Sequence, residues 1–449
     1  MNTQQPTNIE QVAQTREALP SSMRYALGNA DAIPSSTTER MFSANNGNFF
    51  SPLSSNEIRI PVQASEGFLD TAKHYLFFTI KNDSTTEAKK LDGDISCIIE
   101  QVRITSQGVE LERLDDYALL HNYKRLYNQS YTEREMRNAK SGGPETAIDN
   151  VVVGASITHT ESANFCVQLD SGFLMGHHKK ALPMGMAEFE IVIRLNSATN
   201  ALVASTDSDN AYSITNPRFY CPVYKIEDMN VLNQYKMLAS QRGISWSGDT
   251  NKLYMGSLAG NGAGTETIQI NDRSLSLKSL ITMIRPTAKA LATRSLTLSS
   301  SCITGVSQYH YKIGGLNYPQ VPVDVVDATN GINICRLYDQ AVKSFADPGF
   351  AHSQSLVSQA RVIKEYPAVT AADLSNGVDS PNAVVAVDLR RFDDERLSYV
   401  GLNTAKNASP NTLEIVADAG LNYAANTNTY AICEAEYTMG TQGQLSVVV

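Results

Sequence analysis

The sequence predicts an all-β protein in which two β-sandwiches follow one another along the chain. Apolar and polar side chains alternate repeatedly in both halves, a pattern typical of strands with one buried face. Only 18% of the 449 residues are charged while 42% are hydrophobic, and so few charges disfavour long salt-bridged helices. Both halves also share one plan of strands, a segment with helical spacing, and further strands. For an all-β chain of this length we therefore expect two domains.

Residues 1–48 are polar, with scattered Pro, Ser and Asn and only weak helical spacing between Ile9 and Leu19. We predict an N-terminal arm that is partly helical and stands outside the sandwich cores. Such an arm is either disordered by itself or ordered by a neighbouring subunit, and the sequence leaves both alternatives open.

The first sandwich is predicted at residues 49–228. Alternating or strongly apolar segments indicate strands at 57–62, 73–82, 94–105, 108–114, 164–170 and 187–196, with a pair of strands around Asn216-Pro217 at 211–226. Apolar side chains at helical spacing predict a helix within 114–129, with Asp115 or Asp116 as its N-cap. The polar stretch from there to about Asn150 is predicted to be a long loop.

Residues 229–265 are predicted to be a linker with a helix at 229–243, and residues 266–449 a second sandwich. Its strands are expected at 266–271, 274–286, 307–313, 383–392, 412–419, 429–439 and 444–449. A helix is expected at 333–346, because Ile334, Leu337, Val342 and Phe345 fall on one side of it.

The stretch SQYHYKIGGLNYPQVPV, residues 307–323, is predicted to be a core strand followed by a turn. Its tyrosines and Ile313 alternate with His310 and Lys312, so the two sets point to opposite faces. The glycine pair at 314–315 permits a turn with positive φ. The prolines that follow are expected to end the pairing, because proline has no amide hydrogen to donate.

No catalytic, cofactor-binding or metal-binding residue is predicted, and we do not expect an enzyme. His177 and His178 are adjacent, so on a strand they point to opposite faces, and the His-x-His spacing of a cupin metal site is absent. His310 is expected on a polar face or as a core histidine with its hydrogen bonds satisfied. Asp393 and Asp394, within the charged stretch 389–397, do not converge and more plausibly form a surface or subunit-contact cluster.

Two loops carry partial motifs that fail on inspection. Gly260, Gly262 and Gly264 lack the Gly-Lys-Ser/Thr and the helix of a phosphate-binding loop, so a flexible loop is expected. The stretch 206–210 begins like a calcium loop, but Tyr212 stands where that loop needs glycine.

The charges and cysteines exclude further classes of function. The net charge is -9 and no block of five like charges occurs, so no basic stripe supports a specific nucleic-acid site. The six cysteines lie far apart without a CxxC pair, which favours buried thiols in a reducing compartment. We expect neither a signal peptide nor a membrane-spanning segment, because no long apolar run occurs.

Four segments, in order along the chain, resemble those of double jelly-roll major capsid proteins. They are Leu182-Pro183-Met184 before the alternating strand 189–195; the strand with Tyr212, Ile214 and Asn216; the segment from Tyr309 to Pro322; and the loop with Gly401, Asn403 and Thr404. The resemblance covers roughly residues 50–449. It points to the PRD1/adenovirus lineage, and within it to polinton-like viruses and virophages.

This resemblance implies two tandem eight-stranded jelly rolls with short helices in the inter-strand loops. In the family, three copies form a pseudo-hexameric trimer, and the trimers tile an icosahedral shell around double-stranded DNA. The implied partners are two further copies of the chain, neighbouring capsomers, and penton and minor capsid proteins, whereas membrane contact stays open. The implied location is the virion, after synthesis inside a host cell.

The alternative is a tandem β-sandwich binding module, such as a lectin or a receptor-binding spike. It would share the strand pattern, but a lectin would favour clustered tryptophans or calcium-binding carboxylates. The chain has a single tryptophan, Trp246, so the capsid interpretation is preferred.

Overall fold

The computed structural model describes residues 35–449 with gaps. The gaps are residues 64–66, 85–87, 129–130, 143–155, 159, 177–180, 184–187, 204–211, 228–232, 234–236, 238–240, 242, 261–262, 287–300, 302, 304, 326–331, 346–382, 392–399, 408, 418–423 and 441–443.

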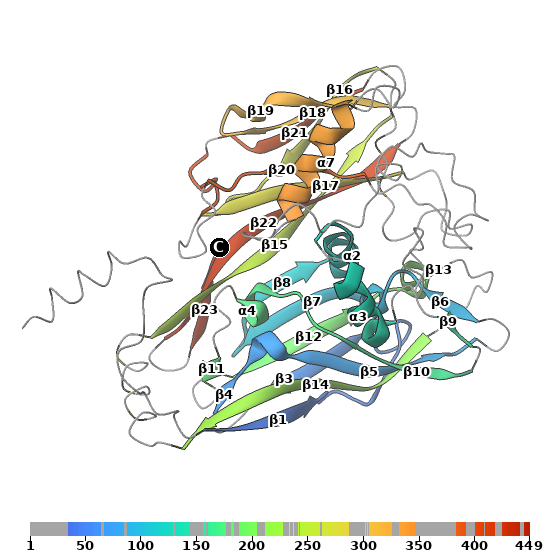
Figure 1. Ribbon diagram of the computed structural model, residues 1–449, viewed down its shortest axis with the longest axis vertical. Helices are drawn as coiled ribbons and strands as arrows, with labels where there is room; N and C mark the ends of the chain where they lie inside the picture. The colour runs from blue at the N-terminus through green and yellow to red at the C-terminus, as the bar shows by residue number, and fades with distance from the viewer. Residues whose placement is uncertain are drawn as a thin grey trace, which may run out of the picture.

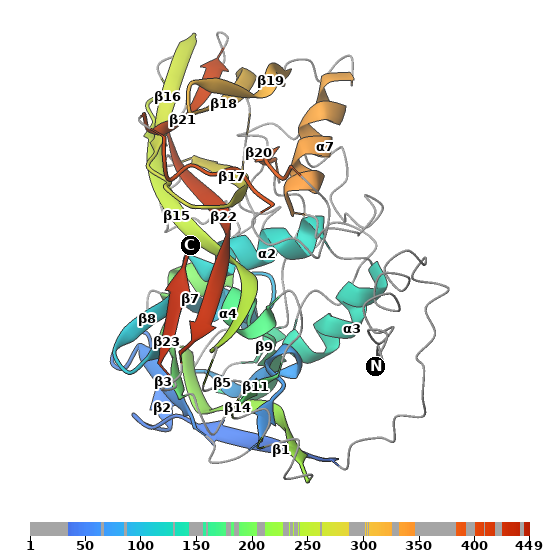
Figure 2. The ribbon, with the colours of Figure 1, turned by 90° about the vertical axis from the view of Figure 1, so that its left-hand side faces the viewer.

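Two groups of antiparallel sheets follow one another along the chain, which confirms the all-β class (Figure 1). Among the described residues, strands before residue 227 pair only with one another, and so do strands after residue 243. We call these groups the first and second units. Figure 2 shows the helices α2, α3 and α7 on the same side of the sheets.

The first unit contains two large sheets and a small one. One sheet has the order β10-β5-β14-β4-β11, with β1 and β2 also on β14; the others are β3-β12-β7-β8 and β13-β6-β9. The strands are β1 (Ser35–Ser43), β2 (Phe49–Phe50), β3 (Glu57–Val62), β4 (Phe68–Leu69), β5 (Tyr75–Asn82), β6 (Lys89–Leu91), β7 (Ile99–Ser106), β8 (Val109–Asp115), β9 (Ser156–Ile157), β10 (Ser162–Val167), β11 (Leu182–Pro183), β12 (Phe189–Leu195), β13 (Leu202–Val203) and β14 (Tyr212–Ile226). Its helices are η2 (Thr71–Lys73), η3 (Ile95–Ile98), α2 (Tyr117–Tyr127), α3 (Tyr131–Ser141), α4 (Gly172–Met175) and α5 (Ala198–Ala201).

The second unit contains two sheets and one long helix. The sheets have the orders β15-β22-β17-β20, with β23 on β22, and β16-β21-β18-β19. The elements are β15 (Ile244–Leu258), β16 (Gly264–Ile270), β17 (Leu277–Pro286), β18 (Val306–Ile313), β19 (Leu316–Asp324), α7 (Ile332–Phe345), β20 (Val385–Asp388), β21 (Asn411–Ala417), β22 (Ala425–Met439) and β23 (Leu445–Val448).

The cores form as the alternation predicts. Along β5 the residues Leu76, Phe78 and Ile80 are buried and their neighbours are partly exposed, because successive strand side chains point to opposite faces. The predicted helices are present as α2 and α7, and each turns its apolar side toward the core. Their burial supplies most of their stability, since isolated helices of this length are marginal in water.

Among the strands that the sequence analysis did not expect, one lies in the expected arm and one in the expected linker. Strand β1 falls within the expected arm, and it pairs along its whole length with β14. Strand β15 falls within the expected linker, and it pairs along its whole length with β22. Neither strand shows a regular alternation of apolar and polar side chains. Each is a strand because its backbone pairs with a long neighbouring strand. We therefore propose unit limits at residues 35–226 and 244–449.

Three other local expectations were wrong. The expected loop after α2 contains α3, and residues 95–98 form η3 before the strand begins. The expected strand pair at 211–226 is the single strand β14, bulged where Asn216 has φ 51° and the register shifts. The helix expected at 229–243 lies almost entirely outside the described residues.

The stretch 307–323 forms the hairpin β18–β19 at a sheet edge. Tyr309 and Tyr311 are fully buried, and φ at Gly314 and Gly315 is 59° and 84°, as predicted. The expectation that the prolines end the pairing was wrong, because β19 continues to Asp324. The ladder instead skips residues 319–322, and an edge strand tolerates proline in such a bulge.

Replacing Gly314 and Gly315 by valine is expected to cost about 1–2 kcal/mol per position, because β-branched residues resist positive φ. A Cβ at Gly315 would meet nothing within 4 Å, so the cost there comes from the backbone alone. The measurement is thermal melting beside Leu316→Val, an exposed position on the same hairpin. Equal melting temperatures would contradict the turn's role.

Candidate functional site

Among the candidate residues that the structure describes, His310 and the loop containing Gly260 each contact a glutamate side chain. His310 lies on β18 opposite the buried tyrosines, and its Nε2 is 3.1 Å from Oε2 of Glu414 on β21. Lys312 contacts the same carboxylate at 2.5 Å. His310, itself largely buried, thus belongs to a cross-strand cluster of polar side chains.

The glycine loop before β16 closes on a carboxylate. The amides of Ala259 and Gly260 donate to the side chain of Glu266, at 2.8 and 3.2 Å. An acidic side chain therefore occupies the amides that a phosphate would need. Residues 177–178, 206–210 and 393–394 lie outside the described residues.

Among the described residues, no group of three His, Cys, Asp or Glu side chains could hold a metal ion. No disulfide links the cysteines in this part of the chain. None of its helices is long and apolar enough to span a membrane.

The most distinctive geometry is the contact between the two units. In Figure 1 the long strands β15 and β22 run from the second unit down to the first. There β15 packs against β8 and α4, and β23 packs against β8. The two units therefore meet through strands as well as loops.

The contact depends on two glycines that bring main chains together. A Cβ on Gly248 of β15 would lie 2.0 Å from the carbonyl oxygen of Gly172, the first residue of α4. In the other direction, a Cβ on Gly172 would lie 2.6 Å from the carbonyl oxygen of Asp249. Only residues without a side chain permit this approach.

Glu112 of β8 holds α4 in place from the other side. It is 4% exposed, and its carboxylate accepts hydrogen bonds from the amides of Gly172 at 2.9 Å and Phe173 at 3.2 Å. The hydroxyl of Ser171 donates to it as well. Burial raises the pKa of Glu112, while these hydrogen bonds act in the opposite direction. The carboxylate thus satisfies amides at the start of α4 that lack a partner within the helix.

An aromatic cluster covers the same contact. Phe173 of α4 lies edge-on to Trp246 and to Tyr437, with centroids 5.4 and 5.3 Å apart, and the indole of Trp246 donates to the carbonyl of Phe173 at 3.3 Å. All three side chains are buried. Edge-to-face pairs of this kind add to the gain from burial alone.

Asp116, at the start of α2, also reaches the second unit. Asp116 is the N-cap residue, one of the two predicted positions, but it has a left-handed conformation and its side chain makes no cap hydrogen bond. Its carboxylate instead accepts from Asn428 at 2.8 Å, and its carbonyl accepts from the hydroxyl of Tyr430 at 3.0 Å.

Sequence reasoning missed this interface. A weak signal was available, since a glycine inside a strand such as β15 suggests close approach of another backbone. For Glu112 no signal existed: the register of β7 and β8 shifts between Ile104 and Thr105, so both Leu111 and Glu112 are buried and the alternation fails there.

The fold of the whole chain is similar to solved viral capsid structures. The crystal structure of PBCV-1 VP54 fitted into a reconstruction of the virophage Sputnik has a TM-score of 0.61 and 11% identity, and the match covers 95% of this chain and 99% of that one. The Sputnik virophage structure gives 0.52 and 12%, with 100% and 93% covered. The mavirus major capsid protein gives 0.50 and 12%, with 100% and 95% covered. No family model and no curated protein matches the sequence.

These solved proteins contain two jelly rolls in one chain. This chain has the double jelly-roll fold. The first and second units are its two jelly rolls, and the interface described above joins them.

In this double jelly roll the helices extend the interface. Tyr127 of α2 stacks on Phe345 of α7 with centroids 5.0 Å apart and also lies near Tyr338. The contact between the jelly rolls therefore includes helices α2 and α7 as well as α4 and the strands.

The Gly401–Thr404 loop has a structural role within the second jelly roll. A Cβ on Gly401 would lie 2.6 Å from the main chain of Leu277. The hydroxyl of Thr404 donates to the buried carboxylate of Asp272 at 3.0 Å and accepts from the amide of Ser274 at 2.9 Å.

Proposed function

We propose that this protein is the major capsid protein of an icosahedral double-stranded DNA virus, and that it acts by assembly in the virion without a chemical step. The observation that carries the proposal is the end-to-end match with capsid structures, which leaves little of either chain uncovered. The same match favours a capsid protein over the alternative, a tandem β-sandwich binding module, because the matched structures are viral major capsid proteins.

The interface between the jelly rolls supports the proposal physically. Backbone contact between β15 and α4, together with the buried Glu112, fixes the relative orientation of the two jelly rolls. A chain that presents two jelly rolls in a fixed orientation supplies six in a threefold arrangement, which gives the near-sixfold outline that tiling of a shell requires.

The proposed assembly is a homotrimer that contacts neighbouring capsomers, with penton and minor capsid proteins at special positions. Light scattering of the purified protein at neutral pH should give about three times the 49.0 kDa of one chain. Electron microscopy of the same sample should show particles with a near-hexagonal outline. A stable monomer or dimer at micromolar concentration would argue against the proposal.

A further inference from the structure

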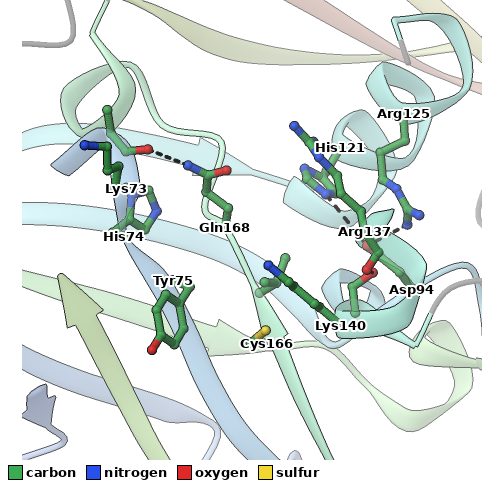
Figure 3. A pocket seen from close by; sticks show the side chains of 13 residues that line it. Lys73, His74, Tyr75, Asp94, His121, Arg125, Arg137, Lys140, Cys166 and Gln168 are labelled. Atoms are coloured by element: carbon green, nitrogen blue, oxygen red, sulfur yellow. Dashed lines mark hydrogen bonds and ion pairs between the residues drawn. The ribbon is translucent and has the colours of Figure 1, made fainter. Parts of the chain in front are cut away.

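A cavity of about 710 Å³ opens in the first jelly roll. Its walls are formed by residues 72–75 of η2 and β5, Asp94, two side chains of α2, three of α3, and residues 166–168 at the end of β10. Figure 3 shows Lys73, His74, Tyr75 and Gln168 on one side of it, and His121, Arg125, Arg137 and Lys140 on the other. Cavities of this size accommodate small organic molecules.

The lining is cationic. It contains Lys73, Arg125, Arg137 and Lys140, against the single carboxylate of Asp94. Asp94 is already neutralised within the wall, since its carboxylate lies 2.5 Å from the guanidinium of Arg125. The same guanidinium donates to Asn138 at 2.7 Å, so Arg125 is held in place.

The cationic side chains on the two walls of the cavity differ in whether they have an ion-pair partner. Lys73 contacts the carboxylate of Asp70 at 3.0 Å and the hydroxyl of Tyr224 at 2.8 Å. Within the described part of the chain, neither Arg137 nor Lys140 has an ion-pair partner, and both are exposed. They lie three residues apart on α3 and thus on one side of the helix, and both line the cavity.

The two histidines in the wall add no charge at neutral pH. His74 contacts the carbonyl of Thr71 through Nδ1 at 2.5 Å and accepts from the amide of Leu169 through Nε2 at 2.9 Å. Burial lowers the pKa of His74 to about 4 and lowers that of His121 as well. The free positive charge of the cavity is therefore that of Arg137 and Lys140.

We propose that this cavity binds a small organic phosphate through Arg137 and Lys140. A guanidinium fork and an ammonium group together suit the oxygens of a phosphate. The cavity is much larger than a phosphate group, and Ala72, Val167 and the ring of Tyr75 offer less polar surface for the rest of the molecule. A phosphate of this kind can come from a free nucleotide or from a lipid headgroup.

The test is calorimetric titration of the full-length protein with ADP, glycerol phosphate and pyrophosphate, at low and at high salt. We expect saturable binding, tighter for the organic phosphates than for pyrophosphate and weakened by salt. Tighter binding of ADP than of glycerol phosphate assigns the site to nucleotides, and the reverse order assigns it to lipid headgroups.

The double variant Arg137→Gln/Lys140→Gln should bind roughly tenfold more weakly or worse, because two charged hydrogen bonds are lost. The matched control is Lys90→Gln/Lys406→Gln, two exposed cations away from the cavity.

A second readout uses the cysteines. Cys166 lines the cavity, whereas Cys335 is exposed on α7. A bound ligand should slow alkylation of Cys166, followed by mass spectrometry, and leave Cys335 unaffected. The proposal is wrong if none of the three compounds binds, or if both double variants bind equally well. It does not depend on capsid assembly, because every measurement uses the purified protein.

Discussion

Replacing Glu112 by alanine is expected to lower the free energy of unfolding by about 3 kcal/mol, since it leaves several buried hydrogen-bond donors without their acceptor. The amides of Gly172 and Phe173 and the hydroxyl of Ser171 all donate to this carboxylate. In the variant these donors stay buried without an acceptor, which is the costly outcome. The measurement is thermal melting followed by circular dichroism, with hydrogen exchange at α4 as the local readout.

The matched control is Glu110→Ala, two residues earlier on the same strand but exposed. A surface change of this kind should stay within about 0.5 kcal/mol of the unmodified protein. Glu112→Gln keeps one acceptor oxygen and should lie between the two alanine variants. If Glu112→Ala melts together with Glu110→Ala, the carboxylate does not hold α4 in place.

Gly248→Ala is expected to cost about 1–3 kcal/mol, the usual range for overpacking a well-packed site. The added Cβ would lie 2.0 Å from the carbonyl oxygen of Gly172 and 2.7 Å from its carbonyl carbon. Both are main-chain atoms, so no flexible side chain can move aside, and α4 must shift away from β15. We therefore expect faster hydrogen exchange at the interface as well as a lower melting temperature.

Gly440→Ala provides the control for this substitution. A Cβ there would have its nearest neighbour at 3.6 Å, the carbonyl oxygen of Gln444, which is an ordinary contact. The two variants make the same chemical change at positions that differ in the space available. Equal stability and equal exchange at α4 would show that the close approach does not control how the jelly rolls join.

Much of the fold could be predicted from local sequence. Strands such as β3, β5 and β21 bury alternate residues, and a period of two is visible without a structure. The apolar side of α7 and the positive φ of Gly314 and Gly315 were also predictable, because each depends on a few neighbouring residues.

The remainder depended on segments far apart in the chain. Strands β1 and β15 have little alternation of their own and become strands because β14 and β22 lie beside them. Helix α3, in a polar stretch predicted to be a loop, places Arg137 and Lys140 on the cavity wall.

By itself, the sequence determined the β class, most of the strands, the core sides of two helices and, through its resemblance, the double jelly roll. The tertiary structure alone decided which glycines bring main chains together, that Glu112 is buried against α4, and which cations share a cavity. The physical reason is the separation along the chain of the residues that determine each feature. Alternation and turn conformation are set by covalent neighbours, whereas burial of a charge and backbone contact between jelly rolls depend on residues that only folding brings together.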